Sequence, residues 1–219
     1  MRIGCIIQAR LGSTRLPNKV VEYIGARRMI DHVVERCETI EPRFPVFVAW
    51  DTGYDCAGND VLQRYLLASA DHRLDAIMRV TGDCPLVDPA VCRRVLNVFR
   101  SGHYDFVAND VWPSYPNGLG CEIFSRVSLE EAHENAKLPH SSDREHVTPW
   151  IKRGLNLVGG RRYCGINLRC PTRGLENLKL SVDTQEDLDR VRAIHEQNPR
   201  DYSLEQTLDA AKKAGIWKN

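Results

Sequence analysis

The sequence predicts an α/β protein with a Rossmann-like, mostly parallel sheet and helices on both of its faces. Three observations lead to this prediction: short runs that are almost wholly apolar, stretches with apolar residues at helical spacing, and the regular alternation of the two. A strand without polar positions must be covered on both faces, as inside a parallel sheet. With 219 residues, 42% of them hydrophobic, the chain can build such a core, and we expect one domain over residues 1–219.

The first half of the chain supplies three strands and two helices. Arg2–Ile7 and Val46–Trp50 are apolar runs typical of buried strands, and Ala76–Val80 is a third. Between them, apolar residues recur at helical spacing from Ile30 to Ile40 and from Leu62 to Ser69. This order of strand, helix and strand is typical of parallel pairing.

The second half continues with shorter elements. Asp is a typical helix-capping residue and Pro is typical of the first helical turn. Asp88 and Pro89 therefore predict the start of a helix that runs to Phe99. Ser128 with Glu131 forms a capping-box pattern. The other expected elements are the strands Phe106–Ala108, Glu122–Phe124 and Leu178–Val182, and the helices Leu129–Ala136, Glu186–Glu196 and a C-terminal one capped by Ser203 with Gln206.

Charge and cysteine content exclude several classes of protein. The 30 basic and 29 acidic residues leave a net charge of +1, whereas nucleic-acid binders usually show a basic excess. The eight cysteines form no C-x-x-C pair, so neither a zinc site nor a disulfide framework is indicated. The sequence shows no signal-peptide pattern and no run long enough to span a membrane. We expect a cytoplasmic protein with reduced thiols that binds neither nucleic acid nor membrane.

The loop after the first strand concentrates groups that bind phosphate. Arg10, Arg15 and Lys19 supply the positive charge that a triphosphate requires. Gly12 allows close approach of the backbone, and successive amides in such a turn can form an anion nest. The carboxyl end of a strand is also where α/β sheets place phosphates, although a merely solvated loop is the alternative. We predict that the nucleotide site includes Ala9, Arg10, Leu11, Gly12, Ser13, Thr14, Arg15 and Lys19.

Two aspartates follow predicted strands. Asp83 comes after Gly82 at the end of Ala76–Val80, where it can hold Mg²⁺ or simply form a turn. Asp183 begins a predicted helix, and together with Glu186 it satisfies a helix cap by itself. The residues alone leave both alternatives open for Asp83 and favour the cap for Asp183.

The loop sequence resembles a known family. Residues 9–19 read ARLGSTRLPNK, which is similar to the opening signature of cytidylyltransferases that make CMP-activated acidic sugars. The longer string IIQARLGSTRLP, residues 6–17, is closer to the SpsF-like branch of spore coat polysaccharide synthesis. The stretches Ile77–Asp83, Tyr115–Leu119 and Arg144–Pro149 also resemble that branch. The resemblance covers about Arg2 to Glu196 and leaves the C-terminal helix, residues 200–219, outside the family core.

This resemblance implies the fold of nucleotide-diphospho-sugar transferases and a Mg²⁺-dependent transfer of CMP from CTP to a small acidic acceptor, with release of pyrophosphate. Relatives of this kind suggest a homodimer. The catalytic groups would be Arg10, Arg15, Lys19 and Asp83, with Arg79 and Gly82 also at the nucleotide. Asp83 and Asp183 would hold the metal, so we expect Asp183 to be both cap and ligand. The acceptor-side candidates are Glu122, Arg144 and His146.

Two departures from the family pattern keep other functions open. Only Asp51–Asn59 fills a space where the family has a helix and a strand, so we expect the sheet to lack one edge strand. Gly120 stands where the family has Asp. A nucleotide-binding homologue with weak or no turnover is therefore the alternative. A nucleotide-sugar-dependent glycosyltransferase is disfavoured, because Asp187–Asp189, an Asp-x-Asp pattern, falls within a predicted helix. A protein that binds no nucleotide leaves the phosphate loop unexplained.

Overall fold

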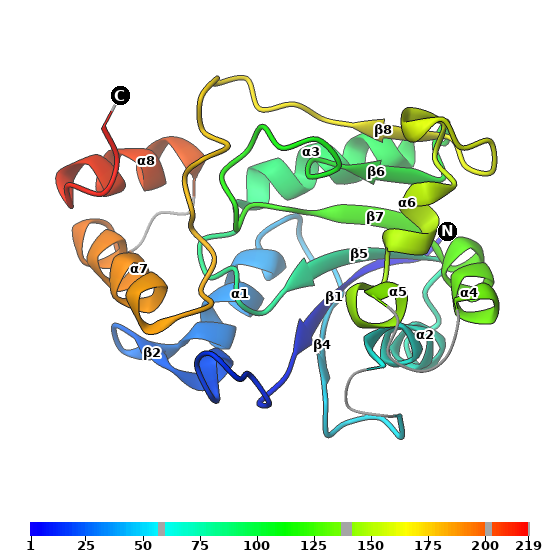
Figure 1. Ribbon diagram of the computed structural model, residues 1–219, viewed down its shortest axis with the longest axis horizontal. Helices are drawn as coiled ribbons and strands as arrows, with labels where there is room; N and C mark the ends of the chain where they lie inside the picture. The colour runs from blue at the N-terminus through cyan, green and yellow to red at the C-terminus, as the bar shows by residue number, and fades with distance from the viewer. Residues whose placement is uncertain (57–59, 137–141, 200–202, 219) are drawn as a thin grey trace.

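The computed structural model describes residues 1–56, 60–136, 142–199 and 203–218. Its centre is a six-stranded sheet with helices on both faces, as the sequence predicts (Figure 1). The antiparallel strand β7 is the exception in an otherwise parallel arrangement. In spatial order the strands are β4 (Val46–Trp50), β1 (Ile3–Ala9), β5 (Ala76–Thr81), β7 (Glu122–Ser125), β6 (Phe106–Ala108) and β8 (Gly165–Asn167).

The pairing register brings several strand ends to one edge of the sheet. Ala9 pairs with Trp50, and Gln8 pairs with Thr81, so β1, β4 and β5 end side by side. Because β7 runs antiparallel, its first residue, Glu122, lies at that same edge opposite Arg79. In open α/β sheets ligands bind at this edge.

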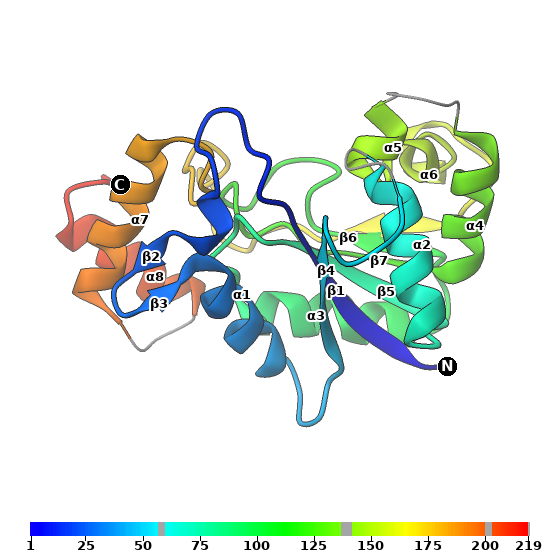
Figure 2. The same cartoon turned by 90° about the horizontal axis from the view of Figure 1, so that it is seen from below.

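Two helical layers bury the faces of the sheet. Figures 1 and 2 show α1 (Met29–Glu38) and α3 (Pro89–Arg100) on one face, and α2 (Val61–Asp71) and α4 (Arg126–Asn135) on the other. The short helices α5 (Ser142–His146) and α6 (Pro149–Arg153) lie beside α2 and α4. Each layer has its own apolar core, one centred on Val33 and Val95 and the other on Leu62 and Tyr65.

A third apolar cluster lies at one end of the molecule. Here α7 (Gln185–Gln197) and α8 (Leu204–Lys213) pack together, near the small hairpin of β2 (Tyr23–Ile24) and β3 (Arg27–Arg28). The N-cap of α3, Asp88, also accepts a hydrogen bond from the Leu204 amide at 2.7 Å. The C-terminal helix thus attaches to the main body at both α7 and α3. Two 3-10 turns, Lys19–Val21 and Asn156–Val158, complete the described elements.

Helix caps confirm two predictions and correct a third. Asp88 caps α3 with Pro89 in its first turn, and Ser203 caps α8 by accepting from the Gln206 amide. The prediction that Ser128 caps α4 is wrong. Strand β7 ends at Ser125, so the chain turns there and the Ser125 hydroxyl accepts the Ser128 amide, while Ser128 is buried inside the first turn.

The predicted late strand Leu178–Val182 is not a strand of the sheet. Its backbone pairs with loops instead: the Leu180 amide donates to Asn117 at 2.6 Å, and the Val182 amide donates to Asp83 at 2.9 Å. The edge of the sheet beyond β6 is formed by β8, which the sequence analysis missed because three residues with a glycine give no clear periodic signal. The consequence is functional, since this pairing fixes the Asp83 loop beside Asp183.

At the opposite edge, β4 is the outermost strand within the described chain, as the short connection predicts. Residues 51–56 form turns, and the rest of the predicted Asp51–Asn59 connection lies outside the described residues. Among the helices that the structure describes, none has the length and apolarity needed to cross a bilayer.

Candidate active site

A cleft of about 630 Å³ opens at the carboxyl ends of β1 and β5. Its walls are the loop after β1, the loop after β5, the segment that enters α7, and parts of α2 and α5. These segments are far apart in the sequence and meet because the strands end at one edge. The location is the one that the sequence predicts for a nucleotide.

Positive groups outnumber negative ones around this cleft. Three acidic side chains line it: Asp83, Glu145 and Asp183. Five cationic side chains line it: Arg10, Arg15, Lys19, Arg64 and Arg79. Because the whole chain carries a net charge of only +1, this concentration of cations is local. It suits a ligand with several negative charges, such as a triphosphate.

Lys19 joins the two predicted metal aspartates. Its Nζ lies 2.8 Å from Asp83 Oδ2 and 3.0 Å from Asp183 Oδ1, and it also donates to the carbonyl of Val182 at 2.7 Å. The ammonium is nearly buried, with 10% of the side chain exposed. Arg15 adds a second cation on Asp183, at 3.0 Å. The structure thus brings together the phosphate loop and both aspartates around one point.

The electrostatics of Asp183 follow from these contacts. Burial alone raises the pKa of this carboxyl, but the hydrogen bond and charge of Lys19, and then those of Lys179, outweigh it and lower the pKa below the ordinary value. Lys179 lies 3.2 Å from Asp183 Oδ2. Asp183 is therefore a carboxylate at neutral pH and available as a hard oxygen ligand.

The prediction that Asp183 caps α7 is wrong. The cap is the next residue, Thr184, which forms a complete capping box with Asp187. The carboxylate of Asp187 also accepts the amide of Asp183 at 3.0 Å. Because the two neighbours perform the capping, the side chain of Asp183 is left to face the cleft.

The chemistry of the two aspartates fits Mg²⁺. Both carboxylates converge on the same ammonium group, so both can reach one cation in its place. In the described part of the chain there is no cluster of three or more acidic, histidine or cysteine side chains that could hold a metal. Mg²⁺ is commonly held by one or two carboxylates, with water and substrate phosphates as its other ligands. The donor set agrees with that pattern.

The backbone of the phosphate loop is partly committed to its own structure. The Leu11 amide donates to Asp51 at 3.0 Å, and the Ser13 amide donates to the carbonyl of Leu11 at 2.9 Å. A Cβ on Gly12 would meet nothing within 4 Å, so the space above it is free for a ligand. Ala9, Gly12, Ser13 and Thr14 line the cleft, whereas Leu11 is not part of the lining.

Gly82 serves the packing of the site. A Cβ at this position would lie 2.9 Å from the backbone oxygen of Gln8, a contact too short for any side chain. The Gly82 amide donates to that same oxygen at 2.9 Å. The loop carrying Asp83 can therefore approach β1 only because residue 82 is glycine.

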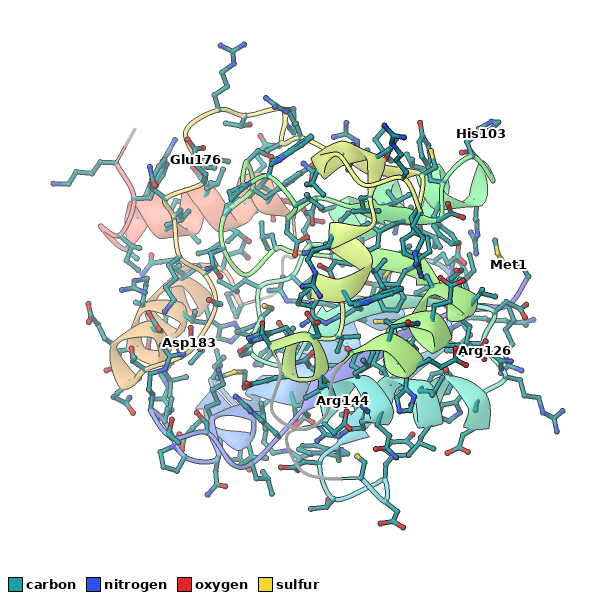
Figure 3. All side chains as sticks on the ribbon, turned by 45° about the vertical axis from the view of Figure 1, so that its right-hand side comes forward. Met1, His103, Arg126, Arg144, Glu176 and Asp183 are labelled. Atoms are coloured by element: carbon teal, nitrogen blue, oxygen red, sulfur yellow. The ribbon has the colours of Figure 1, made fainter. Side chains whose placement is uncertain are left out.

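The three acceptor-side candidates do not come together. His146 lines the cleft. Glu122 lies outside its lining, 1% exposed, and is bonded by Arg79, Thr148 and Lys152. Arg144 is held by Asp60, with its Nη2 2.6 Å from Asp60 Oδ2. Figure 3 shows Arg144 in α5 and Asp183 on the segment that enters α7. Glu122 and Arg144 therefore support the walls, and their acceptor role stays a prediction.

Cys84, next to Asp83, lines the cleft without being a nucleophile. Burial, and after it the charge of Asp83, raise the pKa of this thiol well above its ordinary value. The thiol is neutral at physiological pH, and a neutral thiol is a poor nucleophile. All eight cysteines are free.

A second, smaller cavity of about 310 Å³ adjoins the cleft. Four residues line both spaces: Arg79, Thr81, Cys84 and Asn117. Its far wall includes Asp110 and Glu176, and Figure 3 shows Glu176 on the long segment before α7. No pattern in the sequence predicted this cavity.

Several residues in and around the main cleft were not predicted from the sequence. Arg64 is buried in α2 one turn after Val61, with which it lines the cleft, and a cation at helical spacing from buried apolar residues is a signal that could have found it. Glu145 faces Arg10 from α5, with Arg10 Nη1 3.2 Å from its Oε1. Lys179 gives no signal, because its role depends on the loop pairing of residues 178–182.

Comparisons with known proteins agree with this geometry. A family described as "Cytidylyltransferase" matches residues 4–53, which include the phosphate loop. An uncharacterized protein of Methanocaldococcus jannaschii is 32% identical over 72% of this chain and 70% of its own length. The spore coat polysaccharide biosynthesis protein SpsF of Bacillus subtilis is 28% identical, over 88% of this chain and 85% of that protein.

Two further relatives extend over nearly the whole chain. The 3-deoxy-manno-octulosonate cytidylyltransferase of Brucella suis is 27% identical, over 90% of this chain and 97% of the relative. The solved structure of a cytidylyltransferase from Leptospira borgpetersenii has 26% identity and a TM-score of 0.82, and the match covers 98% of this chain and 95% of that one. The chain therefore belongs to the cytidylyltransferase family of nucleotidyltransferases.

Proposed function

We propose that this protein transfers CMP from CTP to an acidic sugar or a related acceptor and releases pyrophosphate. One observation carries the proposal: Lys19 of the phosphate loop contacts both Asp83 and Asp183, in a cleft with four further cationic side chains. Phosphoryl-type transfer needs a polyanion site and a pair of carboxylates for a metal in the same place. The names of the relatives from Brucella suis and Bacillus subtilis support CMP transfer and a role in polysaccharide synthesis.

In this mechanism the residues of the chain bind, orient and neutralise. Arg15 and Lys19 hold the β- and γ-phosphates, and Arg10 closes the loop against α5 through Glu145. An oxygen of the acceptor attacks the α-phosphorus in line, the bond to the bridging oxygen breaks, and pyrophosphate leaves with the bonding electrons. The cations stabilise the charge that develops on the leaving group. No covalent enzyme intermediate is required.

Mg²⁺ is part of the proposal. Asp83 and Asp183 would hold it, and when bound it polarises phosphoryl oxygens as a Lewis acid. The lowered pKa of Asp183 supports this assignment, because the ligand must be ionised at neutral pH. We also propose a reducing, cytoplasmic setting, which the eight free thiols support.

The test begins with binding. Thermal unfolding is measured with CTP, UTP, ATP and GTP, each with and without Mg²⁺. A ligand at 100 times its Kd stabilises the folded state by about 2.7 kcal/mol, so a selective rise in Tm of several degrees is expected for CTP with Mg²⁺. An equal response to all four nucleotides, or to none, contradicts the proposed donor.

Turnover is then measured as pyrophosphate release from CTP with 3-deoxy-manno-octulosonate and a panel of other sugar acids. The Asp31→Asn variant is the matched control, because Asp31 is a half-exposed, ion-paired carboxylate on α1 outside the cleft lining. Release that depends on both CTP and an acceptor is the expected result. CTP-selective binding without release from any acceptor or from water would instead identify a nucleotide-binding homologue.

A further inference from the structure

The second cavity has a carboxylate that no step of the mechanism above uses. Asp110 follows β6 at the same edge of the sheet as the cleft, and it lines the cavity together with Gly120 and Glu176. Its neighbour Asn109 is buried and fixes the loop, since it donates to the Leu119 carbonyl at 2.8 Å and accepts the Cys121 amide at 2.7 Å. Asp110 is thereby held in place by bonds that do not involve its own side chain.

Charged groups face Asp110 from three elements. Lys152 of α6 approaches its Oδ1 at 3.3 Å, and Glu122 of β7 and Arg79 of β5 act on it through their charges. Burial, and next the charge of Glu122, raise the pKa of Asp110 to about 6, although Lys152 and Arg79 oppose this. The side chain is still 36% exposed. A partly exposed carboxylate that titrates near neutrality is suited to accept a proton.

Gly120 provides the space for this carboxylate. An ideal Cβ on Gly120 would lie 3.2 Å from Asp110 Oδ2 and 3.5 Å from the Cβ of Asp110. A side chain at position 120 would therefore start where the Asp110 carboxylate ends. The Asp110 carboxylate therefore occupies the space beside residue 120.

We propose that the second cavity receives the acceptor and that Asp110 takes the proton from its attacking hydroxyl group. This rests on the proposed function. The acceptor reaches the nucleotide across the boundary formed by Arg79, Thr81, Cys84 and Asn117, which line both spaces. The acceptor oxygen forms a bond to the α-phosphorus, its proton passes to the Asp110 carboxylate, and pyrophosphate leaves with the electrons of the broken bond.

The first test is the loss of the base. Asp110→Asn keeps the shape of the side chain and removes its basicity, so the kcat for pyrophosphate release falls at least about 100-fold, the usual contribution of a general base. The KM for CTP stays within about twofold, because Asp110 lies outside the nucleotide cleft. Asp31→Asn, with a carboxylate of similar exposure, keeps wild-type rates. Wild-type kcat in Asp110→Asn would overturn the proposal.

The second test relocates the carboxylate. The Asp110→Ala variant is compared with the double variant Asp110→Ala/Gly120→Asp, whose new side chain starts 3.2 Å from the original position of Oδ2. We expect the rate of pyrophosphate release by the double variant to be at least about tenfold higher than that of Asp110→Ala. Circular dichroism and Tm establish that both variants are folded. If a folded double variant shows no recovery, the carboxylate does not act in this place.

The pH profile separates a base from a structural carboxylate. An ionised Asp110 is needed, so wild-type kcat rises as pH increases through about 6 and then levels, and Asp110→Asn loses this limb. A limb that persists in Asp110→Asn contradicts the proposal. Failure of the proposed function is distinguishable, since wild-type protein would then release no pyrophosphate from CTP with any acceptor, nor with water as the acceptor.

Discussion

The two sides of the cleft use the same kinds of charged residue in opposite ways. On the phosphate side, Arg15 and Arg10 keep 64% and 41% of their side chains exposed. On the side formed by α5, α6 and β7, Arg144 keeps 4% and Glu122 keeps 1%. The exposed cations have capacity left for a ligand, whereas Arg144 and Glu122 are satisfied by partners within the protein.

Among these four residues, exposure distinguishes the groups that can bind a ligand from those that support the fold, whereas Lys19 holds its two aspartates while only 10% exposed. Breaking a buried ion pair leaves an uncompensated charge in the interior and destabilises the fold. Removing one partner of an exposed pair costs little stability, so such a residue can be selected for ligand binding. Substitutions on the two sides should therefore have opposite signatures, which the following predictions measure.

The largest effect is expected at Asp83, which contacts Lys19 of the phosphate loop and is one of the two proposed metal ligands. Asp83→Asn removes a charged oxygen ligand while keeping the size of the side chain, so kcat for pyrophosphate release should fall by about 1,000-fold, a loss typical of a key electrostatic group. The Tm should change little. Steady-state assays with Asp75→Asn, an exposed aspartate beside the N-terminus, provide the control. Pyrophosphate release at the wild-type rate would show that Asp83 holds no metal.

The second effect is on stability and concerns the supporting side. Arg144→Met leaves the carboxylate of Asp60 buried and unpaired, so the free energy of unfolding should decrease by about 3–5 kcal/mol. For a chain of this size that lowers Tm by roughly 10 °C. Arg126→Met breaks a pair with Glu130 on α4 in which both side chains are exposed, at 39% and 43%, and should cost at most about 1 kcal/mol. Equal losses in the two variants would contradict the distinction by burial.

The third effect is on affinity. Arg15→Gln removes an exposed cation from the phosphate loop, so the Kd for CTP with Mg²⁺ should rise roughly tenfold, the equivalent of one charge-assisted hydrogen bond. The Tm without nucleotide should stay within about 1 °C of wild type. Isothermal titration calorimetry measures the first quantity and thermal unfolding the second. An unchanged Kd would remove Arg15 from the phosphate site.

The smallest effect concerns pH. The folded pKa of Asp183 is lowered, so its pairing with Lys19 stabilises the protein at pH values above the unfolded pKa near 3.8. This stabilisation is lost as pH falls through the lower folded pKa. Urea unfolding between pH 5 and 3 should therefore show a steeper loss of stability in wild type than in Asp183→Asn. Parallel curves for the two proteins would show that the carboxylate is not stabilised by its cations.

The phosphate side was predictable from sequence because its signal is local. Strand Val46–Trp50 has the predicted bounds, and the loop before Lys19 lies in one continuous stretch after a buried strand. Both aspartates follow glycine or strand-like residues that place them at the same edge. The predicted cap at Asp183 was wrong by only one residue, because the adjacent Thr184 can accept the same kind of hydrogen bond.

The other side was not predictable, because its contacts join residues distant in sequence. Arg144 pairs with Asp60 across 84 positions, and Asp110 becomes significant only when Gly120 and Lys152 are placed around it. Periodicity cannot reveal such pairs. For the same reason the segment Leu178–Val182 was interpreted as a strand, although its partners are the loops at Asn117 and Asp83.

A crystal structure with CTP and Mg²⁺ tests the central claim most directly. We expect the β- and γ-phosphates within hydrogen-bonding distance of Arg15 and Lys19, and one metal ion bound by both Asp83 and Asp183. A nucleotide bound elsewhere, or a metal that contacts neither aspartate, would contradict it.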